Sequence, residues 1–147
     1  MPTFPGTAAL RRGRVSIPGQ AYFLTTVVRE RRPLFMEHDT ARRACRVIHD
    51  NKTWADASCV AWVLMPDHWH GLVQLGDLPL STLMSRFKAS VARAAGMGTI
   101  WQKGFHDRAL RNDETLLAAA RYLVANPLRA GLVTRVHDYS YWNAVWL

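Results

Sequence analysis

The chain has 147 residues, of which 49% are hydrophobic, and a formal net charge of +8 from 19 lysines and arginines against 11 aspartates and glutamates. This length suits one folded domain, and the apolar share is that of a packed globular protein, which excludes a disordered or fibrous chain. The positive charge favours a polyanionic partner, nucleic acid first, although charge alone does not separate such a protein from one with a merely soluble basic surface.

The cysteines and the apolar runs bear on location. Cys45 and Cys59 are too few for a disulfide framework and lack any paired-ligand spacing, which suggests buried thiols in a reducing compartment. No run approaches the ~18 apolar residues that a membrane helix requires, and the N-terminus lacks the apolar segment of a signal peptide. We therefore expect a cytoplasmic protein that does not contact membranes.

Residues 1–19 are rich in proline, glycine and arginine, so we expect a basic N-terminal arm with little intrinsic structure. Its arginines are Arg11, Arg12 and Arg14. We expect residues 20–147 to form a single domain. The run 21–28 is β-branched and aromatic, which predicts a strand, and residues 40–52 follow as a helix.

Two short apolar runs, 59–65 and 69–75, are joined through Pro66-Asp67 and predict two neighbouring strands. In residues 81–95 the apolar side chains recur every four positions and Gly96 offers a stop, which predicts an amphipathic helix. The basic side chains of this helix are Arg86, Lys88 and Arg93.

A third helix is expected from about residue 113 to residue 126, because Pro127 disfavours helical geometry at the residue before it. The order of elements is strand, helix, two strands, helix and further helix. That order predicts an α+β fold, in which helices pack on an antiparallel sheet with ferredoxin-like, split βαβ topology.

His68 and His70 flank Trp69 in the last of the predicted strands. Because side chains alternate along a strand, both imidazoles point to one face and could share a cation. Two histidines at this spacing do not by themselves distinguish a metal site from structural histidines, which are common on strands.

Tyr122 and Asn126 lie four residues apart in the third predicted helix, so they are neighbours on one helical face. At 100° per residue, both fall away from the centre of the apolar arc that leucines and alanines form. A tyrosine at a helix edge with its hydroxyl in water has the same pattern, so the residue alone does not identify a nucleophile.

Three ordered segments make the sequence recognisable: VLMPDHWHGLVQL, IWQKGFHDRALRND and ARYLVANPLRAGLV. They resemble signatures of the REP-associated tyrosine transposases, which belong to the HUH superfamily of single-tyrosine transposases. The resemblance extends over residues 21–133. It implies an enzyme that cleaves single-stranded DNA and transfers the strand through a 5′-phosphotyrosine, leaving a free 3′-hydroxyl.

The resemblance also implies roles for single residues. Tyr122 matches the nucleophile, and His68 and His70 match the histidine pair, which Asn126 would complete as a metal site. The implied cofactor is a divalent ion, magnesium or manganese, with zinc as the competitor. Asp67 stands where many relatives have asparagine, and we assign it no ligand role.

The implied partner is single-stranded DNA that carries a hairpin, as in repetitive extragenic palindromes, and relatives include both monomers and homodimers. The residues expected to contact DNA are Arg11, Arg12, Arg14, Arg86, Lys88, Arg93, His106 and Arg108. A solvated helix face or a loop-stabilising network are the alternatives for these side chains.

Three other functions remain compatible with the residues: a DNA-binding protein of the same fold that does not cut, an RNA-binding module, and a metal-dependent hydrolase in which Tyr122 is only structural. Both histidines and Tyr122 are present, and RNA-binding aromatic signatures are not evident. A covalent adduct with DNA would distinguish the transferase from the hydrolase.

Overall fold

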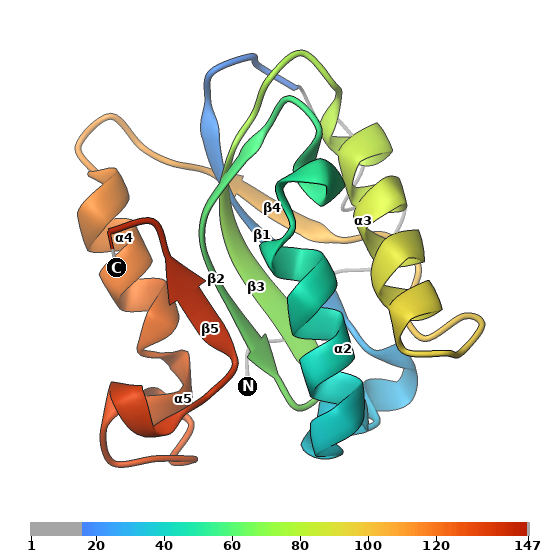
Figure 1. Cartoon of the computed structure of the whole chain (residues 1–147). Helices are drawn as coiled ribbons and strands as arrows, with labels where there is room; N and C mark the ends of the chain where they lie inside the picture. Colours follow the sequence, from blue (N-terminus) through green and yellow to red (C-terminus); the bar gives the residue numbers. More distant parts are fainter. Residues whose placement is uncertain (1–15, 147) are drawn as a thin grey trace.

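The computed structural model describes residues 16–146. The three arginines expected in the N-terminal arm lie outside the described residues. The strands are β1 (Ala21–Val27), β2 (Ser58–Met65), β3 (His68–Gln74), β4 (His106–Ala109) and β5 (Trp142–Ala144). The helices are α2 (His38–His49), α3 (Leu80–Ala94), α4 (Leu116–Val124) and α5 (Asn126–Arg129), with short 3-10 turns at Arg29–Arg31, Leu34–Met36, Asn51–Trp54 and Val136–Asp138. The sheet lies between a layer formed by helices α2 and α3 and a second layer formed by α4 and α5 (Figure 1).

The five strands form one antiparallel sheet with the order β4-β1-β3-β2-β5. Helix α2 connects β1 to β2, and β3 lies between these two strands. Helix α3 connects β3 to β4, and β1 lies between them. The expected α+β sheet with packed helices is confirmed, and β1 to β4 are connected as two split βαβ units, to which β5 adds an edge.

Helices α2 and α3 cover one face of the sheet and α4 covers the other (Figure 1). On the first face, Trp69 and Trp54 stack with ring centroids 5.6 Å apart, and Phe87 of α3 lies 4.4 Å from Trp69. On the second face, Ala120 and Leu123 of α4 pack against the sheet. Aromatic and aliphatic burial of this kind holds the three layers together.

Alternation along β3 assigns its side chains to the two layers. Trp69 and Val73 join the core beneath α2 and α3, whereas Leu72 joins the core beneath α4. His68 and His70 share the α4 side with Leu72. Gly71 leaves room for the indole of Trp69, because a Cβ atom there would stand 2.1 Å from Trp69 Cη2.

The third helix differs from its prediction at both ends. It begins at Leu116, after Thr115, whose side chain accepts a hydrogen bond from the Ala118 amide. Pro127 does not end the helical path, since it lies in the first turn of α5, where a missing N–H group costs no hydrogen bond. Within residues 16–146, no helix combines the length and the apolar character needed to cross a membrane.

Candidate active site

A cleft of about 1170 Å³ opens between the α4 side of the sheet and the segment that contains α4 and α5. The side chains that line it come from β1, β3, β4, α4, α5 and the turns beside them. Its polar lining residues are Thr25, Arg31, Asp67, His68, His70, His106, Asp107, Arg108, Tyr122, Asn126 and Arg129. The cleft therefore brings His68, His70, Tyr122 and Asn126 together, although they come from distant parts of the sequence.

The two histidines of β3 lie next to each other in this cleft. Their ring centroids are 4.7 Å apart, and the ring planes meet at 84°. His68 is buried, and His70 is partly buried beside it. This arrangement follows from strand alternation, which places residues two apart on the same face.

A hydrogen-bond partner fixes one nitrogen of each ring. Nδ1 of His68 donates to the carboxylate of Asp67 at 2.6 Å, and Arg31 forms an ion pair with the same carboxylate at 3.2 Å. Nδ1 of His70 is hydrogen-bonded to the Thr25 hydroxyl, also at 2.6 Å. Partners on Nδ1 orient both rings, so that each Nε2 can act as a metal ligand.

Burial lowers the pKa of both imidazoles, so both are neutral near pH 7. For His68, the hydrogen bond to Asp67 opposes the effect of burial without reversing it. For His70, burial, the nearby His68 and the charge of Arg129 lower the pKa from 6.5 to about 3. Neutral imidazole is the form that binds a metal ion.

Tyr122 is the tyrosine that lines this cleft, and 66% of its surface is exposed. The other three tyrosines have different surroundings. Tyr22 is buried and accepts a hydrogen bond from the Ile17 amide. Tyr139 donates to the Leu64 carbonyl, and burial raises the pKa of its phenol; Tyr141 is hydrogen-bonded to His38. The exposure agrees with the expectation that Tyr122 lies off the core stripe of its helix.

Arg129 of α5 connects two of the candidate residues. Its guanidinium carbon lies 3.8 Å from the centroid of the Tyr122 ring, which is a cation–π geometry. A terminal nitrogen of the same guanidinium donates to Oδ1 of Asn126. The amide oxygen of Asn126 therefore faces a cation in this structure.

The donor set fits a divalent ion. Two imidazoles with oriented Nδ1 atoms, together with the amide oxygen of Asn126 in the same cleft, form a mixed nitrogen and oxygen set of the kind that suits manganese or magnesium. No group of three His, Cys, Asp or Glu side chains able to hold a metal ion occurs in residues 16–146.

The remaining predicted contact residues lie in two places. His106 and Arg108 of β4 line the cleft, where His106 pairs with Thr25 of β1. The Arg108 guanidinium also binds the Glu114 carboxylate at 2.8 and 3.1 Å. Arg86, Lys88 and Arg93 belong to α3, on the opposite face of the sheet, where Lys88 donates to the Gln102 and Gly104 carbonyls.

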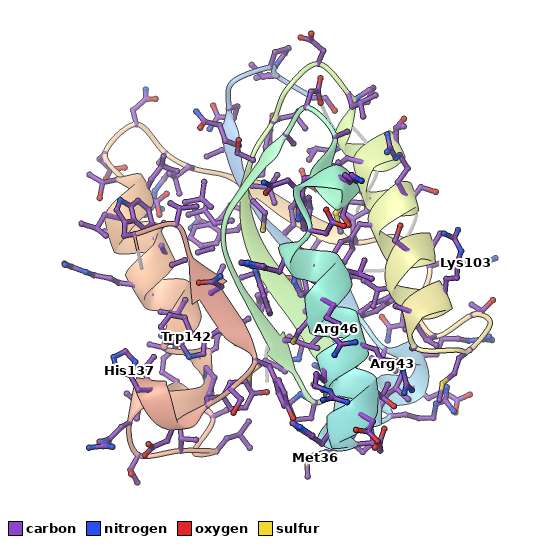
Figure 2. All side chains as sticks on the ribbon, viewed as in Figure 1. Met36, Arg43, Arg46, Lys103, His137 and Trp142 are labelled. Carbon is purple, nitrogen blue, oxygen red and sulfur yellow. The ribbon has the colours of Figure 1, made fainter. Side chains whose placement is uncertain are left out.

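The α2 and α3 layer carries further basic side chains. Arg43 and Arg46 project from α2, and Lys103 lies beside α3, as Figure 2 shows. All three are exposed, and the Arg43 guanidinium donates to the Ala94 carbonyl. The positive charge of the described residues is thus spread over both the cleft and this outer layer.

Reasoning from the sequence missed Thr25, Arg31 and Arg129 as members of the site. Thr25 reaches His70 through the pairing of β1 with β3, which adjoins these two residues. Arg31 reaches Asp67 from a 3-10 turn, and the two residues are 36 positions apart in the chain. Neither contact has a local sequence signal, whereas Arg129 has one, its spacing from Tyr122 and Asn126.

Comparison with known proteins identifies the family of the chain. The family model described as "Transposase IS200 like" matches residues 17–125. A REP-associated tyrosine transposase of Escherichia coli K12 is 29% identical over 132 residues, which are 87% of this chain and 78% of that protein.

Two solved structures are also similar. The structure of a REP-associated tyrosine transposase bound to a REP hairpin has a TM-score of 0.71 and 29% identity, and the match covers 88% of this chain and 79% of that one. A Deinococcus radiodurans protein, with a TM-score of 0.50 and 18% identity over 79% of this chain and 96% of its own, shares the fold. These matches confirm the resemblance that the three sequence segments indicate.

Proposed function

Since the chain belongs to the IS200-like transposase family, we propose that this transposase cleaves and rejoins single-stranded DNA through a 5′-phosphotyrosine on Tyr122. His68, His70 and Asn126 would hold the divalent ion, magnesium or manganese. The observation that carries the proposal is the cleft shared by Tyr122 and the two histidines, which come from opposite walls. A nucleophile and a metal site must address one phosphate, and only shared access allows this.

The divalent ion would draw electron density from a non-bridging oxygen of the scissile phosphate and so make phosphorus more electrophilic. The chain's own groups supply the rest. The Tyr122 oxygen attacks phosphorus and loses its proton to water, while the bond from phosphorus to the 3′ oxygen breaks and that oxygen takes up a proton. The products are a 5′-phosphotyrosine and a free 3′-hydroxyl, and reversal with a new 3′-hydroxyl joins strands.

Positive side chains beside Tyr122 support the attack. Arg129 lies against its ring, and Arg108 of β4 lines the same cleft as Tyr122. Guanidinium groups bind phosphate oxygens well and stabilise charge that develops on them. These two arginines would therefore hold the phosphate while the Tyr122 oxygen bonds to it.

The DNA substrate is proposed to be a hairpin with an adjoining single strand, because the similar transposase structure contains a REP hairpin. Arg86, Lys88 and Arg93, and the arginines at positions 11, 12 and 14, would follow phosphates outside the cleft, and His106 and Arg108 would do so inside it. We further propose that residues 1–19 act as an arm on a single domain of residues 20–147.

The test uses a hairpin oligonucleotide with a single-stranded flank, labelled at its 3′ end, with Mn²⁺ and the full-length protein. Denaturing electrophoresis should show a labelled DNA fragment attached to the protein, since the 5′-phosphate side stays on the tyrosine. Tyr122→Phe should bind the same hairpin and form no adduct, because one oxygen is removed and the exposed ring is kept.

Tyr141→Phe is the matched control, because Tyr141 lies outside the cleft and should leave adduct formation unchanged. An adduct that persists in Tyr122→Phe and maps to Tyr139 or Tyr141 would refute the assigned nucleophile. Cleavage by the wild type that releases a 5′-phosphate without an adduct would indicate a hydrolase. Binding without cleavage would indicate a DNA-binding protein.

A further inference from the structure

Arg129 lies where the proposed nucleophile and the proposed third metal ligand meet. It stacks on the Tyr122 ring at 3.8 Å and donates a hydrogen bond to Oδ1 of Asn126. Arg129 also lines the same cleft as His68 and His70. One side chain thus contacts both candidate residues on the α4 and α5 wall of the cleft.

The hydrogen bond to Asn126 uses the atom that a metal ion would need. An asparagine side chain has one oxygen, and a hard divalent ion binds that oxygen and not the amide nitrogen. A guanidinium bound to the same oxygen would place two positive groups against each other. The two cations therefore cannot both make a close contact with Oδ1 at low cost.

We propose that Arg129 is a positioning residue that competes with the divalent ion for Oδ1 of Asn126, an inference that rests on the proposed function. Without the ion, Arg129 holds the amide and the Tyr122 ring together. With a divalent ion bound to the amide oxygen, the guanidinium would keep its contact with the Tyr122 ring, and its N–H groups would be available to bind a phosphate oxygen. Metal binding at Asn126 would therefore free the Arg129 guanidinium to bind an anion.

Metal affinity without DNA measures this competition directly. The free Mn²⁺ signal in electron paramagnetic resonance gives the dissociation constant for the wild type and for Arg129→Met, which has a similar length but neither charge nor donor. We expect Arg129→Met to bind Mn²⁺ about three- to tenfold more tightly, as the loss of one charge-assisted hydrogen bond to the competing ligand implies.

Arg121→Met is the matched control for charge. Arg121 is an exposed arginine of α4, next to Tyr122 in the chain and absent from the cleft lining. Its replacement should change the Mn²⁺ affinity less than twofold. The decisive comparison is with Asn126→Ala, because in that background Arg129→Met should no longer tighten binding. A tightening that survives would mean that Arg129 acts only by long-range repulsion and would overturn the proposal.

His68→Ala separates the failure of this inference from the failure of the proposed function. If the wild type binds Mn²⁺ no better than His68→Ala, the metal site itself is wrong, and the competition falls with it. If His68→Ala weakens binding while Arg129→Met matches Arg121→Met, the metal site stands and Arg129 does not compete for Asn126. Thermal unfolding of Arg129→Met should stay near that of the wild type, because Arg129 is exposed.

Discussion

Acid should destabilise the metal-free protein through His70. Its pKa is lowered from 6.5 to about 3, chiefly by burial, so in the unfolded chain the ring takes up a proton at a pH where the folded protein keeps it neutral. The contribution of His70 to the free energy of unfolding is therefore fully present above the unfolded pKa, and it is lost as the pH falls from about 6.5 towards 3. One proton corresponds to about 1.4 kcal/mol per pH unit, so between pH 7 and pH 5 the loss is about 2 kcal/mol.

The measurement is urea unfolding, followed by tryptophan fluorescence at pH 7, 6 and 5 in the presence of a chelator. His70→Gln removes the titrating group. Between pH 7 and pH 5, the free energy of unfolding of this variant should therefore fall by about 2 kcal/mol less than that of the wild type. His68 acts in the same direction and remains in the variant.

His137→Gln is the control, because this exposed histidine stacks on Trp142 (Figure 2) and is not among the residues that line the cleft. Its pH dependence should run parallel to that of the wild type. If His70→Gln also runs parallel to the wild type, the histidine is not held neutral by the fold, and the reasoning about the cleft is wrong.

Two further substitutions test packing and ligand orientation. Gly71→Ala should lower the free energy of unfolding by about 1 to 3 kcal/mol, because the new Cβ meets the fully buried Trp69 ring. Gly98→Ala is the control and should change this free energy little, because a Cβ atom there has no other atom within 4 Å. Urea unfolding measures both. Asp67→Ala should weaken Mn²⁺ binding about 10- to 100-fold by releasing Nδ1 of His68, and an unchanged affinity with a normal unfolding midpoint would refute its orienting role.

Three of the five strands, β1, β2 and β3, could be predicted from the sequence because each has a local signal, whereas the short strands β4 and β5 were not predicted. The runs 21–28, 59–65 and 69–75 agree with the observed strands within one or two residues, since β-branched and aromatic residues alternate between two buried faces. The start of the third helix had a misleading signal. Acidic residues near position 113 are typical of a first helical turn, but Glu114 instead binds Arg108 and the Arg111 amide, which keeps that segment in a loop.

The site was only partly accessible from the sequence. Strand alternation alone predicts that His68 and His70 share a face, and the structure has them there. Their meeting with Tyr122 depends on how α4 packs against the sheet, which no spacing reveals, so that expectation rested on family resemblance. Thr25 needed the pairing of β1 with β3, and strand register is a tertiary property.

Arg129 was missed because the sequence did not predict the short helix α5 (Asn126–Arg129) that follows the third helix, although the third helix itself ends at Val124, within two residues of its predicted end. The third helix was expected to end at Asn126 because of Pro127, which removed Arg129 from any helical face. In the structure, Ala125 keeps near-helical angles between α4 and α5, so the helical path continues past the proline. Residues seven apart then lie on one face two turns from each other, and residues three apart are neighbours. Arg129 is seven residues after Tyr122 and three after Asn126, so a helix allowed to continue would have predicted both of its contacts from the sequence.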